Sequence, residues 1–351
     1  MSPLAVGIVG AGLSARSHAL DIITDGEMEL AGVVAGCGSS AAAFADTFGC
    51  DVQTDLPALL RQVDAVVVAV PPEIVLDIVE QTARLGTPCL AEKPLAVTRS
   101  EWGRLGRLAN SEAPVVAPYN RRYATHTRWA ARQLACGKIG AVTEVDAVWV
   151  GPFRDRFAPD APTYRATAGP RHGVLLDSGS HALDLLSLLL GDLSLDLKDV
   201  DLRHNARGAE IAARLEMRHR TGARVRLIID DSKPVSESGD GSHSGAACSG
   251  GERWTCTVRG ETGKLVVDGS SARLRSAGGA TPSRCHPAGE LDRPVTDLRR
   301  LLDGTADAPL GASLPDVLRL SDVLIRALEA DPARRWVRPR GKALGRLNGS
   351  C

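Results

Sequence analysis

The first third of the chain alternates short apolar runs with segments of helical spacing. Uninterrupted apolar residues at 5–9, 30–35 and 65–70 predict strands, because a run without polar alternation suits a parallel strand covered on both faces. Between them, 41–48 and 74–85 carry apolar residues at the period of an amphipathic helix. Alternating strands and helices of this length predict a doubly wound parallel α/β sheet.

Beyond about residue 120 the pattern becomes typical of an antiparallel sheet. Polar and apolar residues alternate along 142–150, 211–217 and 223–229, which indicates strands with one face on a core and the other face open. Two more strands are predicted at 254–258 and 264–267, on either side of a turn at 260–263. We therefore expect an N-terminal domain at 1–120 and an α+β domain at 121–351, with helices on one face of a mostly antiparallel sheet.

Composition narrows the class of protein. The 351 residues carry 42 Lys and Arg against 42 Asp and Glu, so the formal net charge is zero. Nucleic-acid and membrane-surface proteins usually show a basic excess, so neither partner is expected. The eight cysteines are scattered without metal-ligand spacing, so they are expected to be thiols and no metal site is predicted. No signal peptide or membrane span is recognised, which predicts a soluble, cytoplasmic protein.

A glycine-rich turn follows the first predicted strand and opens the first helix. It reads Gly10-Ala11-Gly12-Leu13-Ser14-Ala15. Gly10 permits a tight turn, Gly12 lets the backbone approach a pyrophosphate, and Ala15 permits close packing of helix on sheet. The pattern predicts a dinucleotide site at Gly10, Gly12, Leu13, Ser14 and Ala15, with Rossmann topology. The alternative is a plain tight turn in a flavodoxin-like fold.

The turn after the second strand bears on the choice of cofactor. An acidic residue that would bind the adenosine ribose is missing there, and the chain instead carries Ser39 and Ser40. These hydroxyls could donate hydrogen bonds to a 2′-phosphate, and Arg16 is a further candidate partner for it. The turn therefore favours NADP over NAD, the alternative being a surface turn without bearing on the cofactor.

Glu92-Lys93-Pro94 stands at the end of a buried strand. The carboxyl ends of strands line the ligand crevice of such a sheet, and a residue before proline is biased toward extended geometry. The Lys93 ammonium could hold a substrate hydroxyl beside a nicotinamide. From position alone, a solvated lysine before a helix is equally consistent. Thr98 and Glu101 predict a capping box at the start of that helix.

A second titratable group lies further along the chain. On a helix, Asp177, His181 and Asp184 fall at i, i+4 and i+7 and share one face. A histidine with a carboxylate one turn before it suits acid/base chemistry near neutral pH. Two alternatives remain: a structural Asp177 at the helix N-terminus with a buried His181, or a metal site that lacks an obvious fourth ligand.

Four ordered motifs together resemble the Gfo/Idh/MocA family, typified by glucose–fructose oxidoreductase and inositol dehydrogenase. They are VGAGLSARSH at 9–18, AEKPL at 91–95, NRRY at 120–123 and GVLLDSGSHALD at 173–184. The resemblance extends from about residue 5 to residue 336.

The resemblance implies a role for each matching position. Lys93 would orient and polarise the reacting hydroxyl or carbonyl, its bond to Pro94 being usually cis in the family. His181 would be the general acid/base, and Asp177 would bind substrate and tune that histidine. Arg121 and Asp184 would contact substrate, and Pro71, Pro72 and Glu92 would line the cofactor site. Family members commonly form dimers or tetramers through the open sheet, so a homodimer or homotetramer is expected.

The chain departs from the family pattern just before the active-site helix. Relatives usually carry small glycines there, whereas this chain carries Arg171 and His172. They would narrow the pocket or meet an anionic substituent, the alternative being a solvent-facing loop. Tyr164 and Arg165 stand where relatives often have an aromatic residue followed by arginine. The Ser/Gly-rich stretch Ser232–Gly251 is interpreted as an inserted, mobile loop.

The predicted function is NAD(P)-dependent oxidoreduction of a secondary alcohol of a sugar, aminosugar or cyclitol, or of the matching ketone. Two alternatives come from within the same family: an NAD-dependent glycosidase that uses transient oxidation, and a non-catalytic nucleotide-sensing regulator. Retention of Lys93, Asp177 and His181 disfavours the regulator.

Overall fold

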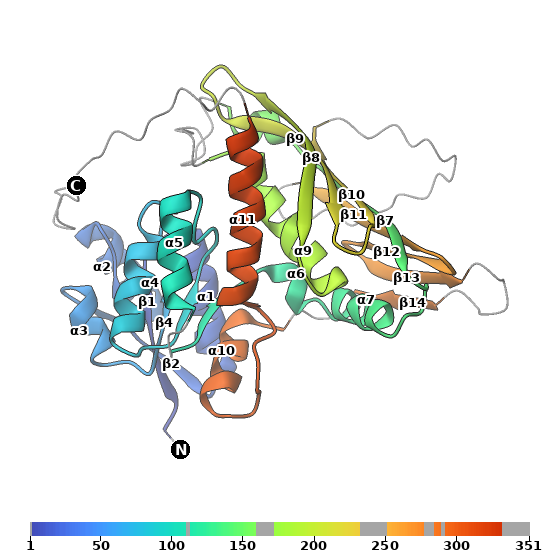
Figure 1. The fold of residues 1–351 in the computed structure, drawn as a ribbon. Helices are drawn as coiled ribbons and strands as arrows, with labels where there is room; N and C mark the ends of the chain where they lie inside the picture. The colour runs from blue at the N-terminus through green and yellow to red at the C-terminus, as the bar shows by residue number, and fades with distance from the viewer. Residues whose placement is uncertain are drawn as a thin grey trace. The chain divides into compact units, whose positions relative to one another are not determined.

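The computed structural model describes residues 2–109, 113–158, 172–231, 251–276, 284–288 and 292–331. They divide into two compact units (Figure 1). The first unit contains the described residues up to Tyr123 together with Asp292–Leu318. The second contains the described residues within Ala124–Leu291 together with those from Arg319 onward. The return of Asp292–Leu318 to the first unit has no counterpart in the continuous domains expected from the sequence.

The sheet of the first unit is parallel, as predicted, apart from one short edge strand. Its order is β15-β6-β5-β4-β1-β2-β3, and β15 alone runs antiparallel, beside β6. Its strands are β1 (Leu4–Val9), β2 (Met28–Val34), β3 (Asp51–Val52), β4 (Ala65–Val68), β5 (Cys89–Ala91), β6 (Val115–Ala117) and β15 (Ala312–Ser313). Strand β4 ends two residues earlier than its apolar run predicts.

Small apolar residues allow α1 (Leu13–Asp25) to pack on this sheet. Ala15, Ala19 and Ile22 share one helical face and are fully buried, in a core with Ile8 and Leu90. The remaining helices of the unit are α2 (Gly38–Phe48), α3 (Leu56–Leu60), α4 (Val75–Arg84), α5 (Arg99–Leu108), α6 (Asn120–Tyr123) and α10 (Pro294–Leu302).

The second unit is built on a mostly antiparallel sheet of order β14-β13-β12-β11-β7-β10-β9-β8. Its single parallel pair is β7 with β10. The strands are β7 (Val142–Val150), β8 (Leu195–His204), β9 (Glu210–His219), β10 (Arg224–Asp230), β11 (Arg253–Gly260), β12 (Gly263–Asp268), β13 (Ser271–Ser276) and β14 (Arg284–Pro287). The predicted architecture is confirmed, although β8, β13 and β14 were not expected.

One face of this sheet is buried and the other is open. Along β7, Val145, Ala147 and Trp149 are fully buried, whereas the alternate residues Glu144 and Asp146 are half-buried and pair with arginines of β10 and β11. Helix α7 (Thr125–Ala135) contacts β12, β13 and β14. The other helices are α8 (Phe153–Arg156), α9 (Ser180–Leu190) and α11 (Leu314–Ala330), whose first five residues belong to the first unit.

Within the described residues, no helix is both long and apolar enough to cross a membrane. Cys50, Cys89, Cys136, Cys256 and Cys285 are free thiols, and burial raises the pKa of Cys89 and of Cys256 to about 12.

Asp297 of α10 ties the returning segment into the first unit. Its side chain is almost fully buried and accepts hydrogen bonds from the Tyr123 hydroxyl at 3.1 Å and from the backbone N–H groups of Leu310 and Gly311, each at 2.9 Å. Asp297→Ala would leave these donors without an acceptor, which we expect to lower the free energy of unfolding by about 3 kcal/mol. Urea unfolding measures the change.

Asp307→Ala is the matched control, because Asp307 lies ten residues further along the same segment and is exposed. Its effect should stay within about 0.5 kcal/mol. Equal effects of the two variants would show that the buried carboxylate has no special role.

Candidate active site

The glycine turn of the first unit requires glycine at its first position. Gly10 has φ +113°, a conformation that L side chains rarely adopt. A Cβ on residue 10 would lie only 2.1 Å from the carbonyl oxygen of Ala69, which follows β4. The Gly10 N–H donates to the Val34 carbonyl at 2.8 Å, and the Ala69 N–H donates to the Val9 carbonyl at 2.8 Å. The turn is therefore bonded to both neighbouring strands.

The N-terminus of α1 is open to a ligand. Gly12 is the N-cap and no side chain caps the helix, so the first backbone N–H groups point outward without an intrahelical acceptor. A Cβ at Gly12 would meet no atom within 4 Å. Leu13 is 88% exposed and Ser14 is exposed, whereas Ala15 is buried. This open, amide-lined end fits the pyrophosphate of a dinucleotide.

The parallel ladder brings the other predicted cofactor residues to the same sheet edge. Because β1, β2, β4 and β5 run parallel, the residues that follow each strand share the carboxyl edge. Ser39 and Ser40 lie in the first turn of α2 and are exposed. Pro71 and Pro72 follow β4; Pro71 is exposed and Pro72 is half-buried. The Arg16 guanidinium lies 5.8 Å from the ring centroids of both Phe44 and Phe48, a cation–π arrangement that orients it.

Lys93 lies in a segment that is held on both sides. Before it, the Glu92 N–H continues the ladder by donating to the Val68 carbonyl at 2.9 Å. After it, the Lys93–Pro94 bond is cis, as the resemblance implies, and residues 94–97 are buried. The predicted capping box closes the segment: the Thr98 hydroxyl accepts from the Glu101 N–H at 3.2 Å, and the Glu101 carboxylate accepts from the Val97 N–H at 3.0 Å. Lys93 itself is half-buried.

The side chain of Glu92 contacts a histidine for which the sequence predicts no role. Its Oε1 atom lies 3.1 Å from Nε2 of His18, a buried histidine of α1. The two residues are 74 positions apart, so only the folded sheet brings them together. One feature of the sequence does single out His18: it is the last residue of the motif VGAGLSARSH, which contains the glycine turn.

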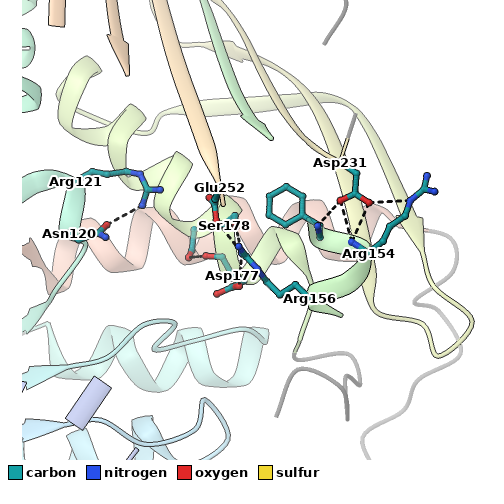
Figure 2. Close-up of polar contacts among 10 residues, drawn as sticks. Asn120, Arg121, Arg154, Arg156, Asp177, Ser178, Asp231 and Glu252 are labelled. Carbon is teal, nitrogen blue, oxygen red and sulfur yellow. Dashed lines mark hydrogen bonds and ion pairs between the residues drawn. The ribbon is translucent and has the colours of Figure 1, made fainter. Parts of the chain in front are cut away.

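Arg121 lies at the end of the first unit, in α6. It is buried and donates to the Asn120 side-chain oxygen at 3.0 Å (Figure 2). The neighbouring Arg122 pairs with Asp316 at 3.3 Å, which gives it a structural role. Of these two arginines, Arg121 is the one that the resemblance places at the substrate.

In the second unit, the predicted active-site helix does not begin as an α-helix. Residues Leu175–Gly179 form a π-helical turn, and α9 continues from Ser180. The expectation of one continuous α-helix is therefore wrong across this turn. Asp177 and His181 are half-buried and Asp184 is fully buried. Such wide turns recur at functional sites because they displace side chains from regular helical spacing.

Asp177 belongs to a charged cluster that the sequence did not reveal. Nη1 of Arg156, at the end of α8, lies 3.4 Å from Asp177 Oδ2 and 3.0 Å from Glu252 Oε2. The Ser178 hydroxyl also donates to Glu252, at 3.2 Å. Figure 2 shows Arg156 directed toward Asp177, Ser178 and Glu252. All three charged side chains are less than one-fifth exposed, so the guanidinium compensates two carboxylates at low solvent access.

The segment before the π-helical turn is only partly described. A Cβ at Gly173 would lie 1.6 Å from the Glu210 Oε2 atom, so a larger residue at 173 would displace this almost fully buried carboxylate. His172 is half-buried. Tyr164, Arg165 and Arg171 lie outside the described residues, as does the predicted loop up to residue 250.

Each unit thus gathers its own part of the predicted site: the first unit collects the glycine turn, the strand-end residues and Lys93, and the second collects Asp177, His181 and Asp184. Within the ranges that the structure describes, no group of three His, Cys, Asp or Glu side chains is placed to hold a metal ion.

Comparison with known proteins names the family. The Gfo/Idh/MocA model described as "Oxidoreductase family, NAD-binding Rossmann fold" matches residues 4–119, and the C-terminal domain model of the same family matches residues 127–266. The chain belongs to the Gfo/Idh/MocA family. The resemblance inferred from the four motifs is therefore confirmed.

Two curated relatives illustrate the range of substrates in the family. Inositol 2-dehydrogenase of Rhizobium meliloti is 28% identical over 53% of this chain and 54% of its own length. A dTDP-3,4-didehydro-2,6-dideoxy-α-D-glucose 3-reductase of Streptomyces violaceoruber is 34% identical over 59% of this chain and 60% of its own length. The matches thus span little more than half of these relatives.

Solved structures share the fold over nearly the whole chain. KijD10, a 3-ketoreductase from Actinomadura kijaniata in complex with NADP and TDP-benzene, superposes with a TM-score of 0.70 at 20% identity, covering 92% of this chain and 96% of its own. GenD2 from gentamicin A biosynthesis, in complex with NAD, superposes with a TM-score of 0.69 at 23% identity, covering 94% and 95%. Relatives of this fold thus bind either nicotinamide dinucleotide.

The two glycines of the turn should respond differently to alanine. Gly12→Ala adds a methyl group in open space, so we expect unchanged stability but at least tenfold weaker dinucleotide binding, because the methyl occupies the approach to the pyrophosphate. Gly10→Ala places a Cβ against the Ala69 carbonyl, so both stability and binding should fall. Thermal unfolding and titration with reduced cofactor measure the two effects. Tight cofactor binding by Gly12→Ala would place the pyrophosphate elsewhere.

Arg156 should contribute to stability through charge compensation. Arg156→Met keeps most of the side-chain packing but leaves Asp177 and Glu252 without their shared cation, which we expect to cost about 2 kcal/mol of unfolding free energy. Adding Glu252→Gln removes one of the two carboxylate charges that faced the lost guanidinium and should recover part of that loss. Chemical unfolding of the single and double variants tests the coupling, and strictly additive effects would exclude it.

Proposed function

We propose that the protein is an NAD(P)-dependent oxidoreductase that interconverts a secondary alcohol and the matching ketone of a sugar, aminosugar or cyclitol. The observation that carries the proposal is the position of Lys93, which follows β5 at the same sheet edge as the open glycine turn after β1. A cation at this edge is available to a hydroxyl or carbonyl presented to a dinucleotide bound there. The family membership supports the same reaction class.

The cofactor would be held by the first unit. The N–H groups at Gly12–Ala15 would bind its pyrophosphate, Gly10 allows the close approach, and Pro71, Pro72 and Glu92 line the neighbouring strand ends. When bound, the nicotinamide supplies the hydride acceptor in oxidation and the hydride donor in reduction.

The proton is moved by this chain's own residues. In oxidation, His181 accepts the substrate hydroxyl proton and Lys93 Nζ donates a hydrogen bond to the oxygen as negative charge develops on it. The Nδ1 atom of His181 is buried, so Nε2 is the nitrogen that we assign to the transfer. Asp177 binds substrate and tunes this histidine, while Arg156 limits the charge around Asp177.

We propose NADP as the preferred cofactor. Ser39 and Ser40 offer hydroxyls at the start of α2, and no carboxylate stands at 35–40 to repel a 2′-phosphate. Arg16, oriented by Phe44 and Phe48, adds a cation on the neighbouring helix. A guanidinium suits a phosphate because it donates in a planar fork.

Substrate contacts are assigned to Arg121 and Asp184, and to four residues at 164–172, of which Arg171 and His172 depart from the family pattern. They are Tyr164, Arg165, Arg171 and His172. The basic members of this group could meet an anionic substituent, and a relative named for a dTDP-linked sugar acts on a substrate that carries one. A cytoplasmic location and a homodimer or homotetramer formed through the open sheet face stay predictions.

A panel of sugars, aminosugars, cyclitols and sugar nucleotides with NAD, NADP and their reduced forms, followed by nicotinamide absorbance, tests the proposal. We expect turnover with at least one member and a higher kcat/KM for the NADP pair. Sugar release from a glycoside without net absorbance change would indicate the NAD-dependent glycosidase instead. Cofactor binding without turnover of any compound would indicate the regulator.

His181→Ala and Lys93→Ala should each lower kcat by about 10²–10⁴-fold, since each removes a group that acts on the reacting oxygen or its proton. Cofactor affinity should stay nearly unchanged. Steady-state kinetics and cofactor titration separate the two quantities. His286→Ala and Lys138→Ala are matched controls outside the proposed site and should retain full activity. A raised KM with intact kcat for Lys93→Ala would make Lys93 a binding residue only.

A further inference from the structure

A buried imidazole–carboxylate pair links α1 to the residue immediately before Lys93. His18 is 5% exposed, and its Nε2 atom lies 3.1 Å from Oε1 of Glu92, whose side chain is 22% exposed. A hydrogen bond between partly buried polar groups of which one is a carboxylate is stronger than an ordinary neutral one. The pair is therefore a firm connection between two elements far apart in sequence.

The surroundings of His18 favour one arrangement of its protons. Its Nδ1 atom is buried and has no hydrogen-bond partner among the described residues. A proton on Nδ1 would thus be buried without an acceptor, which is costly. A proton on Nε2 instead donates to the Glu92 carboxylate and leaves only the Nδ1 lone pair without a donor, so this tautomer costs less.

The pair supplies an anchor for Glu92 beyond its backbone. The Glu92 N–H is held by the Val68 carbonyl, and buried residues follow Pro94. The His18 contact adds a side-chain restraint on the residue that precedes Lys93. The Lys93 side chain is flexible, so the position of its ammonium depends on how well the backbone on either side is held. This matters for the rate, since a shift of about 1 Å at a reacting group can cost 10²-fold.

The same helix carries the open amide end. Ala15, His18, Ala19 and Ile22 form the buried face of α1, and its N-terminus begins after Gly12. The His18–Glu92 bond therefore connects the helix that would bind the pyrophosphate directly to the segment that carries Lys93. Both ends of the connection lie in the first unit.

We propose that His18 is a positioning residue that sets the place of Lys93 relative to the bound dinucleotide by holding the Glu92 carboxylate. The inference rests on the role proposed for Lys93. His18 touches neither cofactor nor substrate in this assignment and acts through Glu92 alone.

Amide variants of His18 test the bond itself. Glutamine carries its amide nitrogen at about the reach of imidazole Nε2, whereas asparagine is too short. We expect His18→Asn to lower kcat about tenfold or more with the cofactor KM within about twofold, and His18→Gln to recover most of the rate. Glu92→Gln, which keeps an acceptor oxygen, should likewise be milder than Glu92→Ala. If His18→Asn does not fold, the comparison of Glu92→Gln with Glu92→Ala replaces it, with the cofactor KM measured alongside kcat because Glu92 is also assigned to the cofactor site.

His219→Asn is the matched control. His219 is equally buried and its Nε2 atom lies 2.8 Å from the Asp192 carboxylate, but the pair lies in the second unit outside the proposed site. It should reproduce any general loss of stability and leave kcat unchanged. An equal fall of kcat in both variants would reduce the role of His18 to general stability and overturn the proposal.

A readout without turnover separates this inference from the proposed function. The chain has six lysines, so ¹³C reductive methylation of the full-length protein gives few NMR signals, and Lys93→Arg assigns the one from Lys93. His18→Asn should move that signal alone, and His18→Gln and His219→Asn should leave it in place. An unmoved Lys93 signal in a folded His18→Asn protein overturns the inference. A moved signal with no turnover across the substrate panel keeps the positioning role and rejects the oxidoreductase.

Discussion

The carbonyl oxygen of Ala69 occupies the space that any side chain on residue 10 would need. This close approach occurs where β1 lies between β2 and β4 in a parallel ladder, so that the turn leaving β1 lies against the residue that follows β4. Glycine at residue 10 permits this contact, and Gly12, which has no side chain to cap α1, leaves the helix N-terminus open. The cofactor site is thus a consequence of strand order as much as of the glycine motif.

The same ladder explains why residues from distant parts of the sequence cooperate. The ends of β1, β2, β4 and β5 lie on one edge, so Ser39, Pro71 and Lys93 share the edge with the glycine turn. The His18–Glu92 contact adds a side-chain link to the backbone ladder, since the helix that follows β1 contacts the residue that follows β5. In this proposal, the backbone around Lys93 is held in place by strand pairing before it, by the buried residues 94–97 after it, and by the His18–Glu92 contact.

In the second unit, two carboxylates lie close together at low solvent exposure. Arg156 lies between Asp177 and Glu252 and offsets both charges, while the π-helical turn sets the direction of Asp177. Removing one member of such a cluster costs more than its own interactions, because the charges that it faced stay at low solvent exposure. Charge balance here is a condition for keeping Asp177, the carboxylate proposed to bind substrate, at low solvent exposure.

Local patterns in the sequence were sufficient for the parallel sheet, the antiparallel sheet, the glycine turn, the Thr98–Glu101 capping box and the family. Each of these depends on hydrophobic period or on residues a few positions apart, which a single chain displays directly. The π-helical turn at Leu175–Gly179, strand β15 and the pairs of His18 with Glu92 and Arg156 with Glu252 were decided by tertiary structure alone. The partners in strand β15 and in the two pairs lie at least 74 residues apart in sequence, and the energy that selects them arises from burial and charge compensation, which no local pattern encodes.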